Sequence, residues 1–243
     1  MIRAWGITDK GAVRQQNQDA YYLDVLSNHL AVGVVCDGMG GAKAGNIASM
    51  LAVEAFTQSL RQIPPTAPED PEALLAQASM SANQAVYHRA RTNPDCRGMG
   101  TTIVAALITP ERAYLLNVGD SRAYYINAGQ IHQVTRDHSL VEDMVRRGDI
   151  TQAQARNHPQ KNLITRALGT EEHVQADFFR QTLESGSRLL LCSDGLSNVV
   201  EDQELLYEVL YGGPSEECCG RLLNIALSRG APDNVTCVLF QFE

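Results

Sequence analysis

Short apolar runs rich in β-branched side chains, bounded by Gly, Asp, Asn or Pro, recur along the chain and predict β-strands. They are Leu30–Cys36, Thr102–Leu107, Ala113–Val118, Arg122–Ile126, Ser187–Cys192 and Val235–Phe242. The first residues of the chain are also strand-like, and a further apolar strand is expected from Ala20.

Other segments place their apolar residues at helical spacing. We predict two long helices over Asn46–Gln62 and Glu72–Arg91, joined by a linker at Pro64–Pro68. Shorter helices are expected over Leu140–Arg147, Gln203–Tyr211 and Ser215–Ser228. The resulting order of elements lacks the strict strand–helix alternation of a doubly wound parallel sheet, so we predict the α+β class with strands stacked between helices.

We expect residues 1–243 to form a single domain. The segment Ser139–Leu168 is rich in Arg, Gln and Asn and poor in apolar runs. It is therefore expected to be a surface insert packed on one edge, not a second domain.

Composition narrows the classes of function. The 243 residues carry 20 Lys and Arg against 28 Asp and Glu, a formal net charge of −8. This charge argues against general nucleic-acid binding, which needs a basic surface. No apolar run reaches the ~18 residues of a membrane span, and the first residues lack the apolar stretch of a signal peptide. The six cysteines include no Cys-x-x-Cys pair, so we expect buried core thiols in a reducing cytoplasm, with no membrane and no zinc.

Four aspartates stand where an apolar strand begins or ends, and they are Asp37, Asp120, Asp194 and Asp233. Any one of them could simply belong to a turn, because the neighbouring Gly supplies a positive φ and Asp bonds its own backbone. Four such positions in one chain favour a second explanation, since buried strands that share a core tend to end near one another.

Carboxylates that converge in this way repel, raise one another's pKa and destabilise the fold unless a cation lies among them. Carboxylate and carbonyl oxygens select Mg²⁺ or Mn²⁺ over zinc or copper. Two such ions roughly 3.5–4 Å apart form a recognised hydrolytic arrangement. The pattern therefore predicts a divalent-metal site built from these aspartates.

Arg14 lies upstream, in the segment that leads to Asp19. A planar guanidinium binds two phosphate oxygens in parallel. Alone, Arg14 would be interpreted as a surface salt bridge. Beside a dimetal cluster, phosphate binding is the better interpretation.

Two further patterns are less specific. Gly98–Thr102 opens a strand, and its glycines either let the backbone pass close under the site or form an ordinary strand start. The Asp-His-Ser tripeptide Asp137–Ser139 resembles a catalytic triad, but triad members must meet in space and not in sequence. We interpret it as a structured turn that leads into the helix at Leu140.

Eight motifs follow one another in a recognisable order: Arg14-x-x-Asn17-Gln18-Asp19, Asp37-Gly38-Met39-Gly40-Gly41, Gly100-Thr101-Thr102, Val118-Gly119-Asp120-Ser121-Arg122, Asp137-His138-Ser139, Arg166-Ala167-Leu168-Gly169, Ser193-Asp194-Gly195-Leu196 and Asp233-Asn234-Val235-Thr236. Together they resemble the metal-dependent, type 2C (PPM) protein Ser/Thr phosphatases, most closely the compact bacterial branch. The resemblance extends over residues 3–242. It implies a four-layer α-β-β-α sandwich, in which helices flank two antiparallel sheets and the metals lie at one end.

The resemblance also implies a role for each aspartate. Asp37 would bridge two Mn²⁺ or Mg²⁺ ions, and the carbonyl of Gly38 would bind the second ion. Asp194 and Asp233 would be ligands of the first ion. Asp120, together with Asp194, would form a weaker site for a possible third ion.

Two residues and one segment complete the implied site. Asp19 would act through metal-bound water, and Arg14 would bind the phosphate. The insert Ser139–Leu168 resembles the mobile flap beside the site, and we call it the flap. The expected reaction is hydrolysis of phosphoserine and phosphothreonine on proteins, in which the metal pair lowers the pKa of a bridging water.

Two positions depart from the bacterial pattern. Ala42 stands where a His is usual, and Asn46 stands where an acid is usual. A nearby His is thought to protonate the leaving alkoxide in related enzymes, so the general acid is open here. Two alternatives follow: a catalytically impaired module that binds phosphopeptides, and a small-molecule phosphatase on the same metal site. By resemblance, we expect a monomer that acts on phosphorylated proteins, with a eukaryotic-like Ser/Thr kinase as its counterpart.

Overall fold

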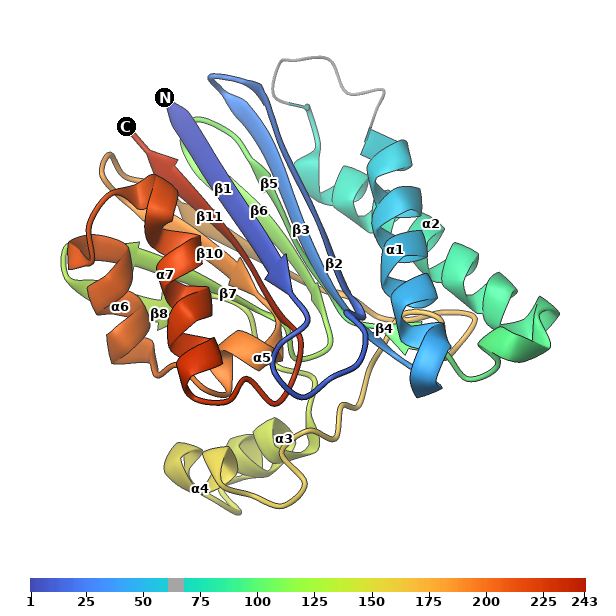
Figure 1. The fold of residues 1–243 in the computed structure, drawn as a ribbon. Coiled ribbons are helices and arrows are strands. Elements are labelled where there is room, and N and C mark those ends of the chain that lie inside the picture. The colour runs from blue at the N-terminus through green and yellow to red at the C-terminus, as the bar shows by residue number, and fades with distance from the viewer. Residues whose placement is uncertain (61–67) are drawn as a thin grey trace.

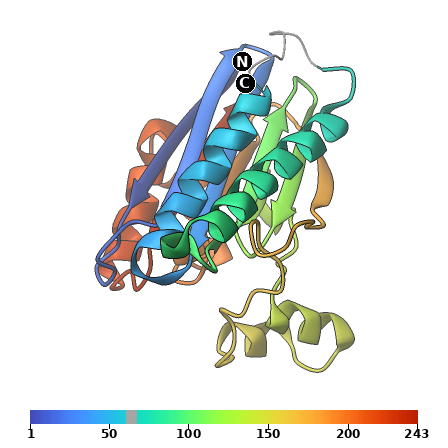
Figure 2. The ribbon, with the colours of Figure 1, turned by 90° about the vertical axis from the view of Figure 1, so that its right-hand side faces the viewer.

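Two antiparallel β-sheets pack face to face, and helices cover both outer faces (Figure 1; Figure 2). The computed structural model describes residues 1–60 and 68–243, and for residues 41–43 it describes the backbone alone. The arrangement is a four-layer α-β-β-α sandwich. The predicted fold class is therefore confirmed.

Each sheet draws its strands from distant parts of the chain. Within the described residues, one sheet has the order β1 (Ile2–Asp9), β11 (Val235–Phe242), β10 (Arg188–Cys192), β7 (Arg122–Asn127) and β8 (Gln130–Gln133). The other has the order β2 (Asp19–Ser27), β3 (Leu30–Met39), β5 (Ile103–Ile108), β6 (Arg112–Val118) and β9 (Asp177–Thr182), with β4 (Gly100–Thr101) paired to the end of β3. The two chain ends meet across β1 and β11, at the end of the sandwich away from the flap (Figure 1).

The two outer layers consist of helices. The long pair α1 (Gly41–Leu60) and α2 (Pro71–Thr92) covers the sheet that contains β3. The helices α5 (Asp194–Ser197), α6 (Asp202–Tyr211) and α7 (Ser215–Ser228) cover the sheet that contains β11. A short 3₁₀ helix η1 (Pro94–Cys96) follows α2. None of the described helices combines the length and the apolarity that crossing a bilayer requires.

The four-layer stacking explains why the central strands are apolar at every position. In β3, Val32, Val34 and Cys36 pack against α1 and α2, whereas Ala31 and Val35 face the opposite sheet. Successive side chains of a strand point to opposite faces, so a strand with a layer on both sides must be apolar throughout. The predicted core thiols Cys36, Cys192 and Cys237 are all fully buried.

The structure corrects several of the predicted bounds. Helix α1 begins at Gly41, five residues before the predicted start, and the linker predicted at Pro64–Pro68 falls almost wholly outside the described residues. The edge strands β8 and β9 were not predicted. Every second residue of β9 is exposed, so its sequence lacks the apolar run that indicates a buried strand.

The flap extends from one end of the sandwich, as Figures 1 and 2 show. It contains α3 (Leu140–Arg147) and α4 (Gln152–Arg156). Ser139 caps the start of α3, Gly148 ends it in a left-handed conformation with φ of 80°, and Thr151 forms a capping box at α4. These caps satisfy the free backbone groups of two short helices that lack a core of their own.

A substitution at Gly33 should test the packing between the sheets. A Cβ atom there would lie 2.6 Å from Cζ of Phe240 and 3.2 Å from Cδ1 of Leu191, and both side chains are fully buried. We expect Gly33→Ala to lower the free energy of unfolding by about 1–3 kcal/mol, as overpacked core positions do. Urea unfolding monitored by circular dichroism measures this.

Gly220→Ala is the matched control, because it adds the same methyl group in helix α7 with no atom within 4 Å. It should raise stability by about 0.5–1 kcal/mol through helix propensity alone. If both variants shift the unfolding midpoint in the same direction, close packing around Gly33 is not the cause.

Candidate active site

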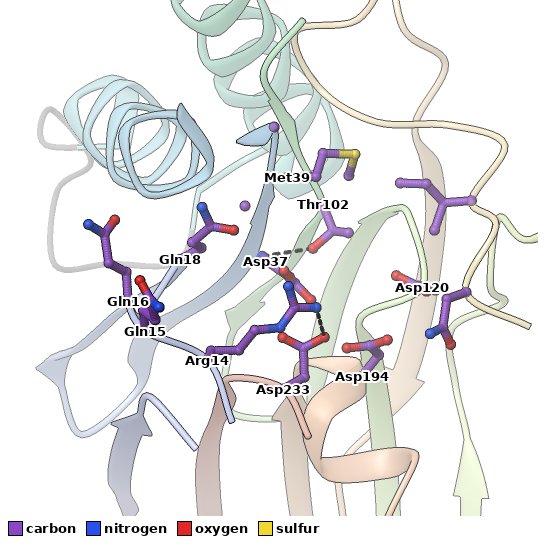
Figure 3. Close-up of a pocket in the computed structure, with 14 residues that line it drawn as sticks. Arg14, Gln15, Gln16, Gln18, Asp37, Met39, Thr102, Asp120, Asp194 and Asp233 are labelled. Atoms are coloured by element: carbon purple, nitrogen blue, oxygen red, sulfur yellow. Dashed lines mark hydrogen bonds and ion pairs between the residues drawn. The ribbon is translucent and has the colours of Figure 1, made fainter. Parts of the chain in front are cut away.

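The end of the sandwich next to the flap gathers five aspartates. Asp19 begins β2, Asp37 lies in β3, Asp120 lies in the turn after β6, Asp194 begins α5 and Asp233 precedes β11. All except Asp19 line one open cavity of about 630 Å³ (Figure 3). The structure thus brings together side chains from opposite ends of the chain.

Asp19 and Asp37 are directly opposite each other on neighbouring antiparallel strands. Asp19 is only 7% exposed, and its Oδ2 accepts a hydrogen bond of 2.7 Å from the Ser193 hydroxyl. Its Oδ1 is buried without a hydrogen-bond partner among the described residues, and so is Oδ1 of Asp194. Two buried carboxylate oxygens are therefore available to a further ligand.

Burial and mutual repulsion raise the pKa of these carboxylates. Burial is the largest cause for Asp37, and the charges of Asp19, Asp194 and Asp120 add to it, so its pKa lies well above the ordinary value. Burial also raises the pKa of Asp120 well above the ordinary value, and that of Asp194 to a smaller extent. Asp19 reaches a pKa of about 7, although hydrogen bonds to Thr236 and Ser193 lower it.

Arg14 is a cation at the rim of this cluster. It lies in the segment between β1 and β2, and its Nη2 donates to Oδ2 of Asp233 at 2.8 Å (Figure 3). The Arg14 side chain remains 52% exposed, so its guanidinium is accessible from the cavity mouth. One exposed Arg cannot neutralise five carboxylates.

Two threonines hold the backbone of Asp37 in place. The amide of Asp37 donates to Oγ1 of Thr102 at 2.9 Å, the amide of Thr102 donates to the Asp37 carbonyl at 2.9 Å, and the Thr101 hydroxyl donates to the same carbonyl at 2.8 Å. Sequence reasoning singled out this segment for its glycines. A Cβ at Gly100 would meet the Leu168 carbonyl oxygen at 3.0 Å, so this glycine makes room for the end of the flap.

Asn234 holds the loop that carries Arg14, and the sequence analysis did not identify this role. Its Oδ1 accepts from the amide of Gln18 at 2.8 Å, and its Nδ2 donates to the carbonyls of Lys10 and Gln16 at 2.8 and 2.9 Å. The side chain is 3% exposed. The one indication in the sequence is that Asn234 directly follows the candidate ligand Asp233. This position does not reveal which backbone groups the side-chain amide contacts.

The pairs Asp37-Gly38 and Asp194-Gly195 are not turns, which corrects the turn interpretation at these two positions, whereas Gly119 before Asp120 does have a positive φ, of 107°. Gly38 continues β3 and Gly195 lies in α5, and neither has a positive φ. A Cβ at Gly38 would lie 2.0 Å from the Gly45 carbonyl oxygen, and one at Gly195 would lie 1.8 Å from that of Asn234. Glycine is required here because other backbone segments approach too closely for any side chain.

The donor set matches a hard divalent cation. The carboxylates supply oxygen ligands only, two of their oxygens lack a partner, and cations relieve the repulsion that raises the pKa values. Among the described residues, however, no group of three His, Cys, Asp or Glu side chains converges closely enough to form a finished metal site. The pocket therefore has the ligand chemistry of a divalent-metal centre.

The flap forms the remaining wall of the cavity. Asn162 and Ile164 from its returning segment line the cavity opposite Arg14. A second cavity of about 530 Å³ lies between the flap and the α5–α6 region and shares Asp120 and Asp194 with the first. Of the two departures from the bacterial pattern, Asn46 has a buried Oδ1 without a partner among the described residues, and the side chain of Ala42 lies outside them.

Comparison with known proteins agrees with this architecture. A family model of protein phosphatase 2C matches residues 10–233. The serine/threonine phosphatase Stp of Listeria monocytogenes is 35% identical over 235 residues, which cover 96% of this chain and 93% of that protein. The crystal structure of Stp1 from Staphylococcus aureus superposes with a TM-score of 0.94 at 38% identity, over 100% of this chain and 96% of that chain.

A third comparison concerns the site. The catalytic domain of the phosphatase PstP, in complex with two manganese ions, superposes with a TM-score of 0.87 at 35% identity, over 99% of this chain and 97% of that chain. The chain belongs to the protein phosphatase 2C family, as its motifs suggested. It is a protein serine/threonine phosphatase, an enzyme that acts on phosphorylated proteins.

The raised pKa values predict how the metal-free protein responds to pH. A carboxyl group whose folded pKa exceeds its unfolded value stabilises the fold at low pH, and this contribution is lost as the pH rises through the folded pKa. For Asp19 that pKa is about 7. In a chelator, the free energy of unfolding should therefore fall by at least about 2 kcal/mol between about pH 5 and pH 8. Saturating Mn²⁺ should abolish or reverse this slope, because it competes with the protons.

Asp19→Asn is the control for this measurement, since it removes one of the buried charges and should flatten the slope. His138 acts in the opposite sense, because burial lowers its pKa, but it is one group against several. A metal-free stability that rises steadily across this range would contradict the proposed repulsion.

Proposed function

We propose that the enzyme hydrolyses phosphoserine and phosphothreonine at a dinuclear Mn²⁺ or Mg²⁺ centre held by the clustered aspartates. The observation that carries this proposal is the set of four aspartates, Asp37, Asp120, Asp194 and Asp233, that line one open cavity beside the buried Asp19, with Arg14 at the rim. Manganese is the favoured ion, because the related PstP domain binds two of these ions.

Each aspartate has a proposed role in holding the ions. Asp37 would hold both ions, and the carbonyl of Gly38 would complete the second site. Asp194 and Asp233 would hold the first ion. Asp120 and Asp194 would hold a third ion more weakly, which their common position in both cavities supports.

Two further groups act around this centre. Asp19 lies behind Asp37 on the next strand, where its unpartnered oxygen can orient a metal-bound water. When bound, the ions supply a nucleophilic water of lowered pKa and neutralise charge on the phosphate.

Arg14 has the geometry to bind the phosphate. Its contact to Asp233 uses a single guanidinium nitrogen, and the planar group offers a pair of parallel donors to two phosphoryl oxygens. These donors would bind the phosphate group equally well before and during the attack on phosphorus, so their contribution is to substrate binding.

The cavity offers no imidazole to the leaving group among the described residues that line it. Protonation of a serine or threonine alkoxide therefore needs another donor, and leaving groups of low pKa should react most readily. We also propose that the enzyme works as a monomer opposite a eukaryotic-like Ser/Thr kinase, an expectation that rests on the family resemblance.

The first test of the mechanism is metal-dependent turnover. With Mn²⁺, the enzyme should hydrolyse both p-nitrophenyl phosphate and a phosphothreonine peptide, and Asp37→Ala should reduce both activities to background, because the bridging carboxylate is lost. The exposed Asp95 in η1 provides the control, since Asp95→Ala removes the same charge away from the cavity and should leave the rates unchanged.

Three outcomes separate the alternatives. The dinuclear mechanism is supported if Asp37→Ala loses activity while the wild-type enzyme and Asp95→Ala both keep it. Absence of turnover on either substrate would support a phosphopeptide-binding module. Much faster turnover of nucleotide monophosphates than of the peptide would support a small-molecule phosphatase.

The second test concerns Arg14. Arg14→Lys keeps the charge but cannot make the paired contact to phosphate, so KM should rise roughly tenfold with little change in kcat. Initial-rate kinetics on the phosphopeptide measure this, with Arg3→Lys at the far end of the sandwich as the control. Unchanged kinetics in Arg14→Lys would restrict Arg14 to its salt bridge with Asp233.

A further inference from the structure

His138 is a buried histidine at the base of the flap, and the mechanism above gives it no role. Its residue is 6% exposed. It lies where three parts of the chain meet: the turn that carries Asp120, the returning segment of the flap, and strand β9. Its polar groups contact all three of these parts.

The Nδ1 side of the ring faces the turn that carries Asp120. The amide of Gly119 donates to Nδ1 of His138 at 3.1 Å, and the amide of His138 donates to the Gly119 carbonyl at 2.8 Å. The two hydrogen bonds form a closed pair. They fix the residue immediately before Asp120 to the residue immediately before the flap.

The Nε2 side of the ring faces β9 and the returning segment of the flap. Nε2 lies 3.2 Å from Oδ2 of Asp177, and the other oxygen of this carboxylate accepts from Nη1 of Arg166 at 2.9 Å. Arg166 belongs to the returning segment, whose Thr165 amide donates to the His138 carbonyl at 2.8 Å. One carboxylate thus joins both ends of the flap to the sheet.

The hydrogen-bond pattern assigns a single neutral tautomer to His138. Nδ1 accepts from an amide, so it carries no proton, and Nε2 therefore carries the proton and donates to Asp177. Nη1 of Arg166 lies 3.2 Å from Nε2, and since a guanidinium only donates, both groups direct their protons to the Asp177 carboxylate and not to each other. Burial lowers the pKa of His138, which favours this neutral ring. The two nitrogens thus have opposite hydrogen-bonding roles and can be tested one at a time.

We propose that His138 is a positioning residue for the phosphatase reaction, whose two ring nitrogens hold the flap and the Asp120 turn in one fixed relation. The inference rests on the proposed function, in which Asp120 binds a divalent ion and the flap borders the substrate. Asp120 lines both cavities, and the flap lines each of them from the other side. A displacement of the turn would therefore change the ion site, and a displacement of the flap would change the peptide site.

Two substitutions divide the ring into its halves. His138→Asn places an amide oxygen near the Nδ1 position, so it keeps an acceptor for Gly119 but cannot reach Asp177. His138→Gln places an amide nitrogen near the Nε2 position, so it keeps a donor for Asp177 but leaves the Gly119 amide without its partner. Asp177→Asn is a third, milder variant, because the Asp177 side chain is 34% exposed and its replacement leaves no cavity.

The readouts are the Mn²⁺ binding isotherm by calorimetry and the KM values for a phosphothreonine peptide and for p-nitrophenyl phosphate. His138→Gln should weaken the Mn²⁺ site that depends on Asp120, identified with Asp120→Asn, by about tenfold, as the loss of a group that supports a ligand does. His138→Asn and Asp177→Asn should leave that isotherm unchanged and raise the peptide KM several-fold, with a much smaller change for the aryl phosphate, which has less surface to contact the flap.

The exposed His132 on β8 provides the control, and His132→Asn should move none of these values. The inference is overturned if the His138 and Asp177 variants lower the melting temperature and both activities in parallel, with the isotherm and the ratio of the two KM values unchanged. Failure of the proposed function would look different, because the wild-type enzyme would then show no Mn²⁺-dependent turnover or no Mn²⁺ site that depends on Asp120.

Discussion

Repulsion among buried carboxylates dominates the end of the sandwich that faces the flap. Burial raises the pKa of Asp37, and neighbouring charges add to this effect. An arrangement of this kind lowers the stability of the protein by itself and becomes favourable only when cations lie among the oxygens. Arg14 provides a single partial compensation at Asp233. The same repulsion would give the proposed ion site its affinity for divalent ions.

The antiparallel sheets bring these charges together with little irregular backbone. Strands that run in opposite directions end and begin at the same edge, so β2 begins where β3 ends, and Asp19 lies directly opposite Asp37. Short polar side chains then fix the positions: Thr102 holds the Asp37 backbone and Ser193 holds the Asp19 carboxylate. Because these supports lie on strands or next to them, the candidate ligands are held more precisely than they would be on loops.

The flap differs in its construction from the body of the protein. Its two helices are capped by residues of the flap and its base, and several polar contacts join it to the sandwich. At its base these are the bonds of His138 and Arg166. On the far side, Arg156 contacts Asp202 at the start of α6 at 3.1 Å. Changes at the exposed polar positions of the flap can therefore alter contacts with a substrate without changing the aspartates of the cavity.

The side chains within each segment made the buried strands and the candidate ligands predictable from the sequence. A strand with a layer on each face must be apolar throughout, so β3, β10 and β11 were recognisable from sequence, whereas the half-exposed edge strand β9 was not. An acid at the end of a buried strand indicated where ligands could gather. The supporting hydrogen bonds were not predictable, because Ser193 lies 174 residues from Asp19 and Asn234 lies 216 residues from Gln18.

The amino-acid sequence by itself determined the class of fold, the candidate ligands and the position of the flap, because these depend on the side chains of each segment. Only the tertiary structure decided that Gly38 and Gly195 accommodate neighbouring backbone rather than form turns. It alone also decided that His138 joins the flap to the Asp120 turn. Such contacts depend on the distance between segments far apart in the chain, and that distance is set by the packing of the whole sandwich.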